Sequence, residues 1–371
     1  MMHRIAVAGL AAALAPLALA QGSQDSIWRT GNDKPIKAKI TQETLGDLKY
    51  SISGGVTSNV PWEQVTRVVY GEGDGPFASA ETAIAKGDFA GAQKTLEGLT
   101  TPRDIFVPRR LFLLGKALQG AQKPKDAEAK YAEVVDKHAD SRWVKFALKA
   151  LVDLQKQEKN YAGAVDTADK GIKIAQGAKL ESAALEFRLE KASVLEAQDD
   201  KIDAAIAEYA KVASDAASSA PKVSQTAKAL QARAMARKGK DANTAQAKAL
   251  VEDVLKSDDS ALLTLAHAAM GEALLVEGVK ESSADKLKDA AILHLLRVDV
   301  QYPPAASESQ EPLEYALYGF VRASSTLMGL AKANKDDAEY WKAQTTAHGR
   351  DFLERFPNSR YAKQVKDLMP R

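Results

Sequence analysis

The spacing of hydrophobic and polar positions changes near residue 75. Apolar and polar residues alternate within residues 36–41 and 48–53, a period typical of strands with one buried face. Apolar or β-branched runs also occupy residues 27–29, 56–60 and 65–70. Together these segments predict about five short strands, a number and spacing that suit a small, strongly bent sheet or barrel.

From residue 77 onward the apolar positions recur with a period close to 3.6, which predicts helices. Residues 71–76, GEGDGP, separate the two patterns. A dinucleotide-binding loop is excluded because Pro76 stands where the third glycine belongs and no βαβ pattern surrounds it. We interpret this segment as a glycine-rich linker that ends in a helix-initiating proline.

The helical part contains an internal repeat. Its clearest marker is an alanine that opens the second helix of each unit, and the separations between successive clear copies are 35, 37 and 41 residues. The four clear positions are Ala92, Ala127, Ala164 and Ala205, and weaker copies surround Ala247, Ala291 and Thr345. A small residue at such a position lets two helices cross closely.

These units resemble the tetratricopeptide repeat, a helix–turn–helix of about 34 residues. The resemblance rests on Leu114-Gly115 in a first helix, on Gly87-Asp88-Phe89 and Asn160-Tyr161 at turns, on the alanines above, and on Pro303 and Pro357 after second helices. It implies a mainly α protein, a right-handed solenoid of about seven helix pairs over residues 77–371, preceded by the small all-β module of residues 21–70. The function that it implies is the recognition of proteins or peptides.

Two further resemblances concern smaller segments. The strand pattern of residues 26–70 is similar to the small Sm-like or SH3-like barrels of exported bacterial proteins. The segment FLERFPNSRYAKQVKDL, residues 352–368, looks like a motif of exported bacterial repeat proteins that act in the cell envelope. The second resemblance implies compartment and scaffold character only.

The first twenty residues have the pattern of an export signal. Arg4 supplies the positive start, an apolar run follows, and Ala18 and Ala20 flank Leu19 in a small-x-small cleavage site. We therefore expect residues 1–20 to be a signal peptide and the protein to be periplasmic or secreted. No other segment has about 18 uninterrupted apolar residues, so no transmembrane segment is expected in the mature chain. A lipid anchor would require a cysteine at the cleavage site, and the chain has none.

Composition narrows the possible functions further. The absence of cysteine excludes disulfides, thiolate nucleophiles and cysteine-based metal sites. A formal net charge of +2, from 51 basic and 49 acidic residues, argues against a dedicated nucleic-acid-binding protein.

A search for catalytic motifs is negative. His138, His267, His294 and His348 have no second histidine three or four residues away, and we expect them at the surface or in loops. The two S-x-x-K matches, at residues 219–222 and 283–286, are no more than chance predicts. We therefore expect no catalytic residue, no cofactor and no metal.

In tetratricopeptide-like repeats, the first helix of each pair lines a concave groove. Aligning the first helices of two repeats on Gly115 and Val152 indicates eight groove positions. They are Arg109, Phe112, Lys116, Gln119, Phe146, Lys149, Asp153 and Lys156. Basic and aromatic residues in this arrangement would suit an extended acidic or C-terminal peptide, while the alternative is a merely solvated helix face.

The sequence thus favours an exported non-catalytic scaffold that binds a protein or peptide partner, and we expect it to act in envelope assembly or maintenance. Two alternatives remain open. One is an envelope enzyme, or an accessory subunit of one, whose carboxylates act on polysaccharide in the solenoid cleft. The other is a structural protein that assembles end to end. The sequence indicates neither the identity of the partner nor the oligomeric state.

Overall fold

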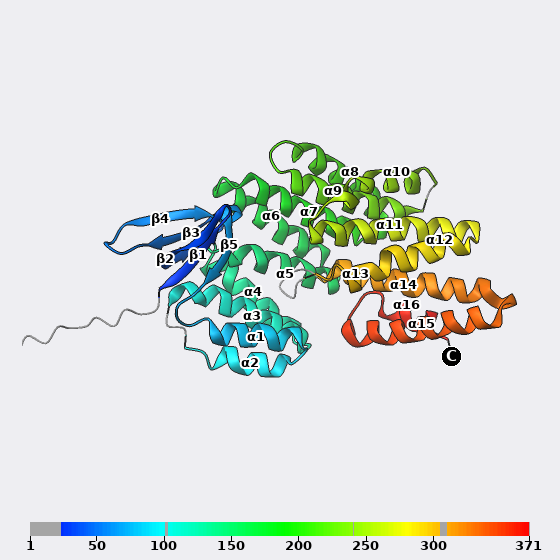
Figure 1. Ribbon diagram of the computed structural model, residues 1–371, viewed down its shortest axis with the longest axis horizontal. Coiled ribbons are helices and arrows are strands. Elements are labelled where there is room, and N and C mark those ends of the chain that lie inside the picture. The colour runs from blue at the N-terminus through cyan, green and yellow to red at the C-terminus, as the bar shows by residue number, and fades with distance from the viewer. Residues whose placement is uncertain (1–23, 101–102, 240, 305–309, 371) are drawn as a thin grey trace, which may run out of the picture.

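A computed structural model of the chain describes residues 24–100, 103–239, 241–304 and 310–370. An N-terminal β-sheet lies at one end of a long array of helices, beside α3–α6 (Figure 1). The predicted signal peptide, with Ala18 and Ala20, lies outside the described residues.

The β-module is a five-stranded antiparallel sheet in the order β4-β3-β2-β1-β5. Its strands are β1 (Asp25–Arg29), β2 (Asn32–Glu43), β3 (Asp47–Ser51), β4 (Thr57–Pro61) and β5 (Val65–Val69). The long β2 pairs with β1 through its first half and with β3 through its second, and its register shifts between Ile40 and Gln42. Such a bulge bends a strand. The prediction of about five strands in a bent sheet is confirmed.

The apolar face of the sheet forms a small core of its own. Five of its side chains are no more than 1% exposed, and they are Ile27, Ala38, Ile40, Leu48 and Val60. These residues occupy alternate positions on their strands, as the period of two in the sequence requires.

The helices follow one another as antiparallel neighbours, and they make seven pairs and a final helix within the described residues. The first pairs are α1 (Gly75–Ala85) with α2 (Phe89–Glu97), α3 (Val107–Gly120) with α4 (Pro124–Lys137), α5 (Trp143–Gln157) with α6 (Tyr161–Gly177), and α7 (Glu181–Glu196) with α8 (Ile202–Asp215). Next come α9 (Pro221–Lys238) with α10 (Asp241–Glu252), then α11 (Ser260–Glu281) with a broken helix, and α14 (Glu311–Leu330) with α15 (Lys335–Arg355), before α16 (Ala362–Leu368). The broken helix consists of α12 (Ala284–Lys288), a π-helical segment (Asp289–Leu295) and α13 (Leu296–Val300).

The first helices of successive pairs contact one another and form one layer. α1 contacts α3, α3 contacts α5, α5 contacts α7, and α7 contacts α9, and the layer continues through α11 to α14. The second helices of the early pairs contact mainly their sequence neighbours. This is the arrangement of a tetratricopeptide-like array, so the predicted fold class is confirmed. We call the surface of the first-helix layer that carries Lys149, Glu186 and Arg233 the inner face.

The repeat positions identified in the sequence all lie in helix crossings. Ala92, Ala127, Ala164, Ala205, Ala247, Ala291 and Thr345 are each no more than 1% exposed. Gly115 faces the ring of Tyr131, and Gly171 faces the ring of Phe187, so closely that a Cβ on either glycine would overlap the ring. Small residues thus lie where a neighbouring helix or aromatic ring approaches the backbone.

The sheet is fixed to the helices by buried polar contacts. Asp25, which is 2% exposed, accepts two hydrogen bonds from the guanidinium of Arg103 at 2.8 Å, and others from the amides of Ile40 and Gly71. The turn before α5 adds a second attachment, where the backbone amide of Arg142 donates to the carbonyl of Glu43 and its guanidinium covers Trp62. The module is therefore attached to the segment before α3 and to the turn before α5.

One helix has the length and apolar composition of a membrane span, among the residues that the structure describes. It is α11, and 67% of its most apolar window is buried inside the fold. That burial is typical of a core helix, and Leu262, Ala266, Ala269 and Ala273 of α11 belong to the apolar core between α9 and α11.

Candidate functional site: the polar inner face

Charged residues line the inner face from α5 to α9, and they pair between successive first helices. Lys149 on α5 contacts the carboxylates of Glu186 at 3.0 Å and Glu190 at 3.5 Å on α7. Lys145 reaches the same Glu186 at 2.8 Å. The side chains of Lys149, Glu186 and Glu190 keep 32%, 24% and 21% of their surface exposed. These charges are therefore held in position and still reach solvent.

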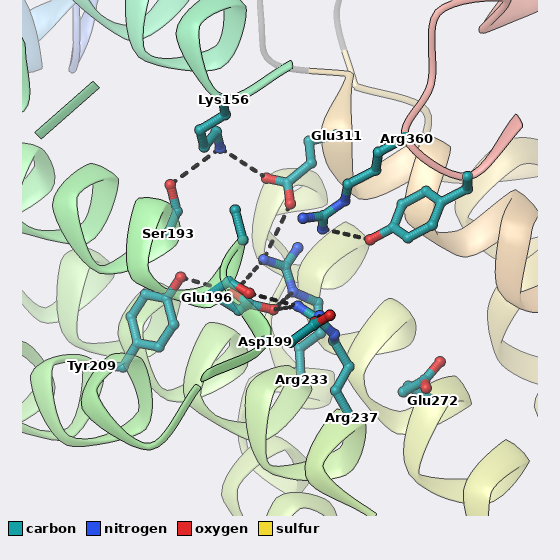
Figure 2. A network of polar contacts seen from close by, with 12 residues as sticks. Lys156, Ser193, Glu196, Asp199, Tyr209, Arg233, Arg237, Glu272, Glu311 and Arg360 are labelled. Atoms are coloured by element: carbon teal, nitrogen blue, oxygen red, sulfur yellow. Dashed lines mark hydrogen bonds and ion pairs between the residues drawn. The ribbon is translucent and has the colours of Figure 1, made fainter. Parts of the chain in front are cut away.

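The centre of the inner face is a buried ion pair. Arg233 on α9 donates to both carboxylate oxygens of Glu196 at the end of α7, at 3.0 and 2.7 Å, and both residues are 2% exposed. The hydroxyl of Tyr209 donates to Glu196 at 3.0 Å, and Arg237 contacts it at 3.3 Å (Figure 2). A carboxylate buried this deeply stays charged only because it has several donors.

Glu311, the first residue of α14, joins this network from the far end of the chain. Its carboxylate lies 3.3 Å from Arg233 and 3.7 Å from Lys156 of α5. Figure 2 also places Arg360, which follows α15, near this carboxylate, with its guanidinium hydrogen-bonded to the hydroxyl of Tyr361. Three separate regions of the sequence thus meet at one point.

Burial and ion pairing act in opposite directions on these groups. Burial acts to raise the pKa of Glu186, but Lys149 and Lys145 lower it to about 2. Burial acts likewise on Glu311, and Arg233 and Lys156 hold the pKa well below its usual range. For Glu190 the burial dominates and raises the pKa despite Lys149. The inner face therefore combines firmly ionised carboxylates with at least one that takes up a proton more readily than usual.

The four groove positions predicted on α3 make mostly structural contacts. Arg109 pairs with Asp74 at 2.5 Å and with Glu81 at 2.9 Å, at the start of the array. Phe112 is buried against aromatic rings, and Gln119 accepts a hydrogen bond from Tyr131 at 2.9 Å. Lys116 is half-buried, and burial lowers its pKa while Asp153 acts to raise it.

The four positions predicted on α5 come closer to the polar network. Lys149 and Lys156 belong to it, and Asp153 pairs with Lys156 at 3.0 Å. Phe146 packs instead against Phe112 and Trp143. The structure thus brings Lys149, Asp153 and Lys156 together, and whether any of the eight residues binds a partner remains a prediction.

Sequence reasoning missed the acidic half of the network, although the repeat period contained it. Adding 37 to the predicted positions Lys149 and Lys156 gives Glu186 and Ser193, which are their hydrogen-bond partners. The same step from Glu196 gives Arg233. Extending the register by one more repeat would have found these residues. No comparable sequence signal marks Glu311 or Arg360.

The expectation that all histidines lie at the surface or in loops is wrong for His267. It is 5% exposed in α11, its Nδ1 lies 3.0 Å from Nδ1 of His294 in the π-helical segment, and Tyr302 stacks on its ring. The two histidines are 27 residues apart, so a search at helical spacing does not pair them. Within the described ranges, no group of three or more His, Cys, Asp or Glu residues is arranged to hold a metal ion.

Comparisons with known proteins show similarity in structure but none in sequence. No family model matches the chain, and no curated protein matches it in sequence. A solved tetratricopeptide repeat protein from Parabacteroides merdae ATCC 43184 aligns over 79% of this chain and 96% of its own, with 12% sequence identity and a TM-score of 0.44. At this level of similarity no partner or activity is assigned.

Proposed function

We propose that the protein is an exported, non-catalytic scaffold that binds a protein or peptide through the inner face of its helix array, in the assembly or maintenance of the cell envelope. The observation that carries this proposal is the row of positioned, partly exposed charges on α5 and α7, centred on Lys149, Glu186 and Glu190. Charged groups held in fixed geometry select a partner by complementarity, since little side-chain entropy is lost on binding.

The N-terminal sequence supports the exported location. Arg4, the apolar run that follows it, and the small-x-small site at Ala18 and Ala20 are the features of a cleavable signal. The test is to fractionate producing cells and to sequence the mature N-terminus. A periplasmic or secreted protein that begins at Gln21 is the expected result, and an uncleaved protein in the cytoplasm would contradict it.

Binding through the inner face is tested by photo-crosslinking in the cell envelope. A photo-reactive residue replaces Lys145, which is 30% exposed on the inner helix α5, and in a matched variant it replaces the exposed Lys211 on the second helix α8. We expect one discrete adduct from position 145, lost when Glu186→Lys and Glu190→Lys are added, and none from position 211. Equal adducts from both positions would contradict an inner-face site.

A second candidate function is suggested by two inner-face carboxyl groups. Burial raises the pKa of both Glu190 on α7 and Glu314 on α14, and the proton donor of a glycoside-cleaving enzyme has a pKa raised in the same direction. The test is turnover of envelope polysaccharide by the purified mature protein. Activity lost in both Glu190→Gln and Glu314→Gln would favour the enzyme over the scaffold.

A further inference from the structure

The beginning of α14 crosses back over the inner face. Glu311 contacts Lys156 of α5 and Arg233 of α9, although α14 packs along its length on α11 rather than on those helices. A second contact of this kind lies nearby, where Asn358 after α15 donates to the side chain of Gln122 between α3 and α4. The last helices of the array therefore meet the second and third helix pairs across the inner face.

The contacts that Glu311 and Asn358 make across the inner face are polar, whereas neighbouring helices are joined by apolar cores. The core of the last helices contains Phe320, Trp341 and Phe352. The core of the first helices contains Phe77, Phe112 and Leu148, and the two cores share no residue.

Polar contacts of this kind respond to solvent conditions. The side chain of Glu311 is 27% exposed and that of Lys156 is 11% exposed, so dissolved ions reach the pair. Salt screens a partly buried ion pair less than an exposed one, but it still weakens such a pair more than it weakens an apolar core. Two kinds of contact therefore hold the array together. Apolar packing joins neighbouring helices, and ion pairing joins distant parts of the array.

We propose that Glu311, with Lys156 and Arg233, is a polar latch, assisted by Gln122 and Asn358, that holds the helix array in a closed form and releases to an open form in which the inner face is more accessible. The apolar contacts between α11 and α14 persist in both forms, so the movement between the forms occurs about them. This inference concerns a conformational equilibrium of the chain itself and does not depend on the partner proposed above.

The test measures one distance in the full mature chain. Because the chain has no cysteine, Lys125→Cys on α4 and Glu354→Cys on α15, both exposed, supply the only two thiols for nitroxide labels. Pulsed electron spin resonance then gives the distance between the two sides of the latch. We expect a single short distance in low salt, and a shift to longer distances in high salt or in Glu311→Lys.

A matched control reverses a charge elsewhere. Asp169 on α6 pairs with Lys191 on α7 at 2.9 Å, and this pair joins neighbouring helices only, so Asp169→Lys is expected to leave the label distance unchanged. If Glu311→Lys does not fold by circular dichroism, Glu311→Gln replaces it, because it removes the charge at nearly constant shape. A label distance that is the same in the parent, in the Glu311 variant and in high salt overturns the proposal. A shift in Asp169→Lys as large as that in the Glu311 variant overturns it equally.

Discussion

Glu196 and Arg233 are 37 residues apart, on the first helices α7 and α9, and form a two-point ion pair inside the array. The spacing is that of one repeat, and it recurs in the contacts of Lys149 with Glu186 and of Lys156 with Ser193. Successive first helices are thus joined by polar contacts at a fixed register, in addition to their apolar packing. Three such contacts along one face give the array a defined stacking geometry.

Removing one partner of the buried pair is expected to destabilise the protein strongly. Arg233→Met leaves the carboxylate of Glu196 buried with only Tyr209 and Arg237 as donors, so we expect a loss of about 3–5 kcal/mol in the free energy of unfolding. Urea unfolding followed by circular dichroism measures it. The exposed pair of Asp169 and Lys191 is the control, and Asp169→Asn is expected to cost less than about 1 kcal/mol.

The double variant Arg233→Met with Glu196→Leu tests whether the stability lost in Arg233→Met comes from leaving the carboxylate of Glu196 buried without its main partner. It places two apolar side chains of similar volume in the same space. Glu311 keeps its contact with Lys156 and Arg237 keeps that with Asp199, while the hydroxyl of Tyr209 loses its acceptor. We expect the double variant to regain most of the stability that Arg233→Met loses. A double variant as unstable as the single one would mean that the pair contributes more than the cost of an unpaired charge.

Gly115 is a place where the repeat pattern and the packing can be tested together. An added Cβ would overlap the ring of Tyr131, which is fully buried, so Gly115→Ala is expected to cost about 1–3 kcal/mol through overpacking. Gly177, at the end of α6, has no atom near the position of an added Cβ. Gly177→Ala is therefore expected to be neutral or to stabilise the protein by about 0.5–1 kcal/mol. Thermal unfolding of both variants checks the difference.

Much of the fold could be predicted because each repeat is a local unit. Tyr131 of α4 packs on Gly115 in the preceding helix, so a short stretch of sequence contains the whole interaction. The contact of Glu311 with Lys156 depends instead on how all the repeats between α5 and α14 stack on one another. No local pattern encodes that stacking, which is why the predicted groove residues omit the closing side of the network.

The pairing of His267 with His294 was missed for a related reason. The π-helical segment shifts the phase of the helix by one residue, so the period of 3.6 does not continue through it. Helical spacing therefore does not predict which residues His294 faces.

The attachment of the β-module is expected to depend on Arg103. Arg103→Ala removes two of the hydrogen bonds to the buried carboxylate of Asp25 and leaves those from Ile40 and Gly71, so we expect a loss of about 2–3 kcal/mol. The loss should appear as faster proteolysis within residues 71–74, between the sheet and α1. Arg110→Ala is the control, because the guanidinium of Arg110 donates to the carbonyl of Leu99 and, among the described residues, to no residue of the sheet. Equal proteolysis of the two variants would show that the ion pair does not hold the module.

Acid is expected to destabilise the contact between α11 and the π-helical segment. Burial, the neighbouring imidazole and Arg297 lower the pKa of His267 to about 4, and burial and Arg297 lower that of His294 to about 4 although Asp289 acts in the opposite direction. In the unfolded chain both would have a pKa near 6.5. The unfolded state therefore binds more protons between these values, so the stabilisation is complete above about pH 6.5 and is lost as the pH falls toward about 4.

The loss between pH 7 and pH 5 is expected to be about 1–3 kcal/mol for the two histidines together. Urea unfolding at a series of pH values measures it. The double variant His267→Gln, His294→Gln should have a smaller decrease than the parent over this range, while His138→Gln, which changes a histidine at the end of α4, should match the parent. If the double variant loses as much stability on acidification as the parent, other groups are responsible. Because both imidazoles are neutral at pH 7, a hydrogen bond from one Nδ1 to the other is available there, and protonation of both rings would replace it with repulsion across 3.0 Å.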